Sequence, residues 1–128
     1  MNGAEKTNGK LPDAELEVML AVWQCMPPVT TARLMRLLER NHSWKTPTVI
    51  SFLDRLKTKG FLKAERQGRE YVYEALVARE DYIVPATEDF LDRIHGQSLY
   101  SLMEAAFRNR PFTGRDAEEL LRWLEKQG

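Results

Sequence analysis

TPTVISFLDRLKTKGFLKAERQGREYVYEA, residues 46–75, changes its hydrophobic period at Gly60. Before Gly60 the apolar residues recur at helical spacing, and Thr46 followed by Pro47 is typical of an N-cap and the first helical position. After Gly60, two short runs (62–66 and 69–75) are rich in strand-forming residues and lie on either side of Gln67-Gly68. We therefore predict a helix that Gly60 terminates, followed by a β-hairpin.

The predicted helix has two different faces. Its apolar stripe, which we assign to the core, consists of Val49, Phe52, Leu53 and Leu56. Thr48, Ser51 and Arg55, at spacings of 0, +3 and +7, lie on an opposite, polar face.

Two more helices precede this one. The first carries a core stripe at helical spacing and ends at Pro27-Pro28; the stripe is Leu16, Met19, Leu20 and Trp23. Thr30 or Thr31 caps the second helix, which turns apolar residues inward. These residues are Leu34, Leu37 and Leu38.

Three helices follow the hairpin. The first covers residues 79–95, where Pro85 implies a bend or a late start. A short helix follows Gly96. The last begins at a capping box formed by Thr113 and Asp116.

This order predicts a mainly α fold with a small β-hairpin. We expect residues 1–10 to form a disordered tail, residues 11–76 a winged helix-turn-helix DNA-binding domain, and residues 77–128 a helical dimerisation region.

The chain is neutral, but its charge is unevenly distributed. Residues 30–70 hold ten lysines and arginines against four acids, so they carry +6, and the remainder carries −6. A basic segment centred on one helix and one hairpin favours a polyanionic partner, with double-stranded DNA the first candidate.

In a helix-turn-helix the second helix of the pair enters the major groove, and here that helix begins near Thr46. The basic hairpin tip would hold the DNA backbone or minor groove. The predicted DNA-binding residues are Lys45, Thr46, Thr48, Ser51, Arg55, Lys57, Lys59, Arg66 and Arg69. A winged helix that binds protein instead of DNA is the alternative.

The C-terminal helices carry more apolar surface than three short helices can enclose. A second copy is the simplest cover, and pairing would place two DNA-binding helices on a dyad. The alternative is that these helices fold back on their own winged helix. Trp123 adds to this apolar surface. The predicted dimer residues are Phe90, Leu91, Ile94, Leu99, Leu102, Met103, Phe107, Leu120, Leu121 and Leu124.

No pattern indicates an enzyme, a metal site or a cofactor. Cys25 is the only cysteine and lies among apolar residues, which favours a core position over a reactive thiol. For His42 we favour a surface or cap role over metal ligation, and for Trp44 packing over stacking on a base. No apolar run suits membrane insertion and no signal peptide opens the chain, so we expect a cytoplasmic protein.

Several stretches together resemble the penicillinase repressor family of bacterial regulators (BlaI/MecI/CopY type). They are residues 11–23, residues 44–61, residues 71–73 and residues 101–120, and the resemblance covers about residues 11–126. It implies a dimeric repressor on a dyad operator that controls β-lactam resistance or related stress genes. It also implies, as in several members, a membrane sensor-protease that triggers cleavage of the repressor.

Three departures from the family pattern stand out. Pro47 and Ile50 replace a lysine and a long polar residue at the start of the DNA-binding helix, so Ile50 joins the predicted DNA-binding residues as a contact for a thymine methyl group. The bond matching the family's Asn-Phe cleavage site is Ala105-Ala106. The copper-responsive branch has a C-terminal cysteine cluster that this chain lacks.

Overall fold

A computed structural model describes residues 10–128. The tail predicted for residues 1–10 lies outside this range except for Lys10. The chain divides into two compact units, one ending at Ala86 and the other formed by Thr87–Gly128. The domain boundary predicted at residues 76 and 77 stays a prediction.

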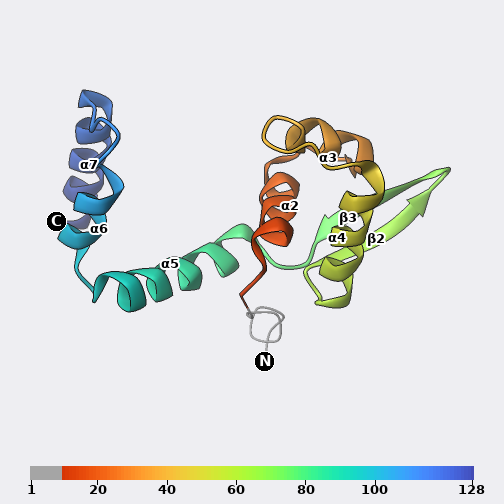
Figure 1. Cartoon of the computed structure of the whole chain (residues 1–128), viewed down its shortest axis with the longest axis horizontal. Helices are drawn as coiled ribbons and strands as arrows, with labels where there is room; N and C mark the ends of the chain where they lie inside the picture. Colours follow the sequence, from red (N-terminus) through yellow and green to blue (C-terminus); the bar gives the residue numbers. More distant parts are fainter. Residues whose placement is uncertain (1–9) are drawn as a thin grey trace. The chain divides into compact units, whose positions relative to one another are not determined.

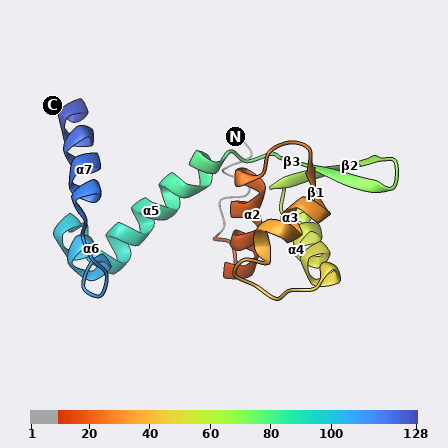
Figure 2. The same cartoon turned by 90° about the horizontal axis from the view of Figure 1, so that it is seen from above.

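The first unit combines three helices with a small antiparallel sheet, as predicted (Figure 1). The strand order is β1-β3-β2, and the β2–β3 hairpin extends beyond the helices in both views (Figures 1 and 2). Its elements are α2 (Asp13–Gln24), β1 (Val29–Thr30), α3 (Thr31–Leu38), α4 (Thr46–Thr58), β2 (Leu62–Gln67), β3 (Glu70–Ala75) and the beginning of α5 (Arg79–His95).

The core stripe predicted for α2 was only partly right. Met19 is buried, but Leu16, Leu20 and Trp23 are half-buried. The most deeply buried part of α2 lies at Val18, Met19 and Val22 instead. Trp23 packs against the edge of the core, where its indole Nε1 donates to the carbonyl of Val77 at 2.9 Å.

Helix α3 begins at the predicted cap. The Thr30 Oγ1 accepts a hydrogen bond from the Arg33 amide at 3.3 Å, and Leu34 and Leu38 are buried below it. Thr30 also belongs to β1, a strand of two residues that the sequence did not indicate. This strand pairs with β3, so the same short segment caps α3 and attaches it to the hairpin.

Helix α4 begins one residue earlier than predicted. Lys45 is the N-cap, with φ −81° and ψ 158°, and its carbonyl accepts hydrogen bonds from the amides of Thr48 and Val49. Thr46 is therefore the first helical residue and Pro47 the second, so the N-cap assignment to Thr46 was wrong. Lys45 makes no side-chain capping bond.

The other end of α4 is closed as Gly60 predicts. Gly60 has φ 85°, a conformation that costs little only for glycine. Its amide donates to the carbonyl of Lys57 and the amide of Phe61 donates to the carbonyl of Leu56, the hydrogen-bond pair of a Schellman motif. Because Leu56 and Phe61 are both buried, this turn also inserts the next residue into the core.

The hairpin has a two-residue turn. Gln67 pairs with Glu70, which leaves Gly68 and Arg69 at the tip. Gly68 has φ 66°, as the first central residue of a type II′ turn requires. The predicted centre at Gln67-Gly68 was thus one residue early.

The second unit contains the rest of α5, α6 (Leu99–Ala106) and α7 (Gly114–Gln127), close to the predicted bounds. Within residues 87–128, all of which the structure describes, no side chain is buried. Contacts between residues close in sequence link its neighbouring segments. The rings of Phe107 and Phe112 meet edge to face, and His95 Nδ1 lies 2.9 Å from the Ser101 hydroxyl.

The capping box of α7 is confirmed. The Thr113 hydroxyl accepts from the amide of Asp116, while the Asp116 carboxylate accepts from the amide and the hydroxyl of Thr113. The hydrogen bond from the Thr113 amide, and then that from its hydroxyl, holds the pKa of Asp116 below its usual value.

A carboxyl with a lowered pKa in the folded state stabilises that state above its unfolded pKa and loses this contribution as the pH falls through the folded pKa. We therefore expect α7 to fray from its N-terminal end in acid, as Asp116 becomes protonated. NMR titration of the Asp116 carboxyl carbon checks this. Thr113→Val should raise the pKa of Asp116 only part of the way, because the backbone amide remains. An unchanged pKa in Thr113→Val would show that the hydroxyl contributes nothing.

Candidate nucleic-acid interface

The core determines which side of α4 faces outward. Val49, Leu53 and Leu56 are fully buried, so Thr48, Ser51 and Arg55 point away from the other helices. Phe52, which the sequence assigned to the core stripe, is half-buried and packs at the edge of the core against Trp44. Ile50 is an exception to the polar character of this surface, with 40% of its area exposed. All ten predicted DNA-binding residues are exposed: Lys45, Thr46, Thr48, Ile50, Ser51, Arg55, Lys57, Lys59, Arg66 and Arg69.

The outward face of α4 is polar but carries little net charge. Thr48, Ser51 and Arg55 are exposed along it, as their spacing predicted. Asp54 also lies exposed in this helix, with a carboxylate oxygen 4.0 Å from the ammonium of Lys57. It was not among the residues predicted to bind DNA. The Asp54 carboxylate limits which DNA groups this face can contact, because a carboxylate accepts hydrogen bonds from cytosine amino groups and repels phosphates.

The hairpin tip presents cations to solvent. Arg66 is the next-to-last residue of β2, and its Nε donates to the carbonyl of Gly68 at 3.2 Å, which holds its side chain beside the turn. Arg69 lies in the turn itself. Both guanidinium groups lack an acidic partner among the described residues, so they are available to an external anion.

Tyr71 brings the hairpin and α4 together. Its ring lies 6.0 Å from the Lys57 ammonium and 5.9 Å from the Arg66 guanidinium carbon, both within cation–π range. Tyr71 is the cross-strand partner of Arg66. These contacts of Tyr71 were not predicted from the sequence, although an aromatic residue opposite an arginine in a hairpin is a recognisable signal.

The loop before α4 is held by stacked rings. His42 and Trp44 stack with 3.9 Å between centroids and 5° between planes, and Trp44 meets Phe52 edge to face. The His42 Nε2 lies 3.1 Å from a carboxylate oxygen of Glu17 on α2. Trp44 thus packs, as predicted, and His42 fastens the loop to α2.

Lys59 has a different setting from the other predicted DNA contacts. Its ammonium lies 2.5 Å from a carboxylate oxygen of Glu15, whose side chain is only 4% exposed. This ion pair joins the first turn of α2 to the residue that follows α4. Since Glu15 has no other described ion-pair partner, Lys59 has a structural task that competes with phosphate binding.

A family model described as Penicillinase repressor matches residues 11–126. The chain belongs to the penicillinase repressor family. It is 31% identical to the penicillinase repressor of Bacillus licheniformis over 91% of both chains. It is 23% identical to the methicillin resistance regulatory protein MecI of Staphylococcus aureus (strain N315), over 92% of this chain and 95% of that protein.

A solved structure supports the fold. The DNA binding domain of the repressor BlaI, determined in solution, superimposes with a TM-score of 0.51 at 32% identity. The match covers 59% of this chain and 90% of that domain.

Membership in the penicillinase repressor family confirms the resemblance drawn from the sequence and the functional class: these are transcriptional repressors and not enzymes. Within residues 10–128 the structure has no helix with the length and apolar character of a membrane span. The same residues contain no group of histidine, cysteine and acidic side chains placed to bind a metal ion.

We expect Lys59→Met to destabilise the protein by about 1–3 kcal/mol, because it leaves the buried Glu15 carboxylate without its partner. Chemical denaturation of the full chain measures this change. The double variant Glu15→Leu/Lys59→Met should recover most of the loss, since it removes both charges.

Lys63→Met is the matched control. Lys63 pairs with the exposed Glu74 at 3.4 Å, so its removal should change the free energy of unfolding by less than about 0.5 kcal/mol. Equal losses in Lys63→Met and Lys59→Met would contradict a structural role for the Glu15–Lys59 pair.

Proposed function

We propose that this chain is a homodimeric, sequence-specific DNA-binding repressor that acts in the cytoplasm on a dyad operator. Helix α4 enters the major groove and the hairpin tip holds the DNA backbone. The observation that carries this proposal is the division of α4 into a buried apolar face and an exposed polar face, next to a hairpin tip whose two arginines have no acidic partner among residues 10–128.

Family membership supports the DNA-binding part, since the domain of BlaI that aligns with this chain is described as its DNA binding domain. The names of the relatives, penicillinase repressor and methicillin resistance regulatory protein, support target genes in β-lactam resistance or related stress responses. Sequencing the DNA that the protein retains from its own genome tests this assignment. The presence of a membrane sensor-protease gene beside its own gene tests the proposed sensor partner.

The exposed face of α4 supports a distinct base preference. Thr48 and Ser51 offer hydroxyl groups that accept or donate hydrogen bonds at base edges, while the exposed Ile50 fits a thymine methyl group. Charge contributes little here, because Asp54 offsets nearby cations. Selectivity then depends on shape and hydroxyl contacts, and affinity depends on the arginines and lysines around them.

Arg66→Ala and Arg69→Ala should each weaken binding to all DNA sequences by a similar factor. Each should also reduce the slope of log affinity against log salt by about 1, from roughly −5 per protomer for six phosphate contacts. Ser51→Ala and Ile50→Ala should instead change the preferred sequence and leave the salt slope unchanged. Gel shifts on operator and scrambled duplexes at several salt concentrations separate these effects.

Two results would count against this assignment. Arginine variants that altered only sequence preference would show that the hairpin does not hold the backbone. A wild-type protein without salt-dependent DNA binding, which instead retained a protein partner, would favour the adaptor alternative.

The second unit supports the dimer. It buries no side chain, yet its large apolar residues on α5, α6 and α7 are exposed or half-buried. On α7 they form a continuous stripe, with Leu120, Leu121 and Leu124 all exposed. We propose that this stripe packs against the same stripe of a second copy. The exposed members of the predicted dimer set are Phe90, Ile94, Leu99, Leu120, Leu121 and Leu124; the half-buried ones are Leu91, Leu102, Met103 and Phe107.

Leu121→Lys should dissociate the dimer, because it buries an unpaired ammonium in the proposed interface. Sedimentation equilibrium at micromolar concentration should show a dimer for the wild type and a monomer for the variant. Glu119→Lys adds the same side chain on the opposite side of α7 and should remain a dimer. A monomeric wild type, or equal behaviour of the two variants, would refute the proposed interface.

A further inference from the structure

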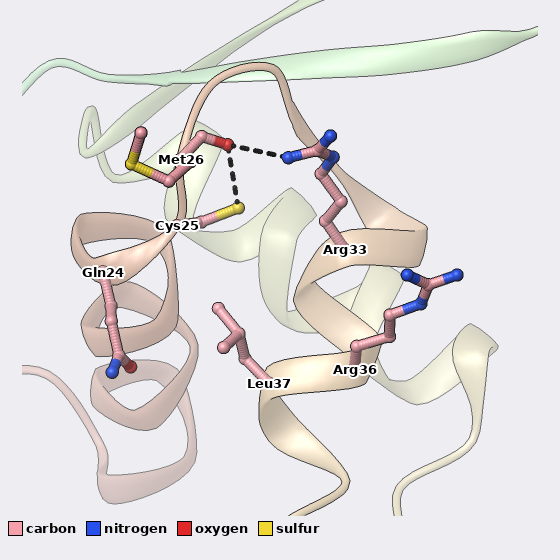
Figure 3. A pocket seen from close by; sticks show the side chains of 6 residues that line it. All are labelled: Gln24, Cys25, Met26, Arg33, Arg36 and Leu37. Atoms are coloured by element: carbon pink, nitrogen blue, oxygen red, sulfur yellow. Dashed lines mark hydrogen bonds between the residues drawn. The ribbon is translucent and has the colours of Figure 1, made fainter.

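A hollow of about 390 Å³ lies between the end of α2 and one side of α3. In Figure 3 the guanidinium of Arg33 reaches across to the carbonyl of Met26, and Leu37 points into the space between the two helices. The hollow is lined by Gln24, Cys25, Met26, Arg33, Arg36 and Leu37.

The charged part of this lining is entirely positive. Arg33 and Arg36 are three residues apart on α3 and both line the hollow, and Figure 3 shows their guanidinium groups turned in different directions. No acidic side chain of residues 10–128 pairs with either guanidinium. The described partner of Arg33 is the carbonyl of Met26, which accepts from its Nη1 at 3.4 Å, a long and replaceable hydrogen bond.

The rest of the lining is mostly apolar. Leu37 and Cys25 are half-buried and pack against the core, and Met26 is largely exposed at the rim. The Cys25 thiol is turned to the Met26 carbonyl at 3.4 Å. The volume is at the lower end of the range for small-molecule sites, which combine apolar walls with a few polar anchors.

We propose that this hollow binds a small organic acid, with its anionic group on Arg33 and Arg36 and its apolar body against Leu37 and Met26. Each guanidinium supplies donors in the planar arrangement that suits a carboxylate, and both arginine side chains are exposed, so they can turn toward one anion. A bare phosphate of the DNA backbone offers the same charge but nothing for the apolar wall. The inference does not depend on the proposed repressor function.

The test uses the full chain and three probes: benzoate, benzamide and inorganic phosphate. Benzoate and benzamide share a shape but differ in charge, and phosphate has charge without an apolar body. In ¹H–¹⁵N NMR titrations, benzoate should give saturable shifts at the amides of residues 24–26 and 33–37. Its dissociation constant should be in the millimolar range, as is usual for so small a ligand. Benzamide and phosphate should each bind on the order of tenfold more weakly.

Variants of two exposed arginines, one in α3 and one just after it, locate the benzoate site. Arg36→Gln should weaken benzoate binding on the order of tenfold, whereas Arg40→Gln, outside the hollow, should leave it unchanged. The proposal is overturned if benzoate gives no saturable shift, if benzamide or phosphate equals benzoate, or if both variants behave alike. It is also overturned if Arg36→Gln lowers the salt slope of DNA binding as Arg66→Ala is expected to, because Arg36 would then serve the DNA backbone.

Discussion

The burial of Val49, Leu53 and Leu56 against the other helices is the constraint on which the first unit depends. Each fully buried aliphatic side chain contributes about 1.5–3 kcal/mol, so the three together outweigh any alternative rotation of α4 about its axis. Once these residues face inward, helical geometry places Thr48, Ser51 and Arg55 outward. The surface proposed for DNA is therefore largely a by-product of core packing, and Thr48 and Ser51 are free to vary without loss of the fold, whereas Lys59 also pairs with the buried Glu15.

Polar contacts from α2 then secure both ends of α4. Glu17 reaches His42 in the loop before the helix, and Glu15 reaches Lys59 immediately after it. Apolar packing fixes which face of α4 is buried, and these two directed contacts at opposite ends add to it in fixing the position of α4 along its axis. The Glu15–Lys59 pair also makes one cation of the basic segment less available to an external anion than the charge of +6 indicates.

The two units differ in how much of their structure is self-sufficient. In the first, helices and sheet enclose a continuous core of buried residues from α2 to the beginning of α5. In the second, local signals maintain the helices: Ser98 caps α6 and the Thr113–Asp116 box caps α7. Caps contribute about 1 kcal/mol each, which is too little to stabilise short helices in water without a packed face. This difference is the physical reason for proposing that a second copy of the chain covers the apolar faces of the second unit.

The amino-acid sequence by itself determined the order of the elements, the end of α4 at Gly60, the hairpin with Gly68 in its turn and the capping box of α7. Each depends on conformational preferences that act within a few residues. The tertiary structure alone decided that α2 is buried around Val18, that two residues of β1 join the sheet, that Tyr71 lies between Lys57 and Arg66, and that Lys59 pairs with Glu15. Glu15 and Lys59 are 44 residues apart, and such partners are chosen by the packing of whole elements, which local preferences do not specify.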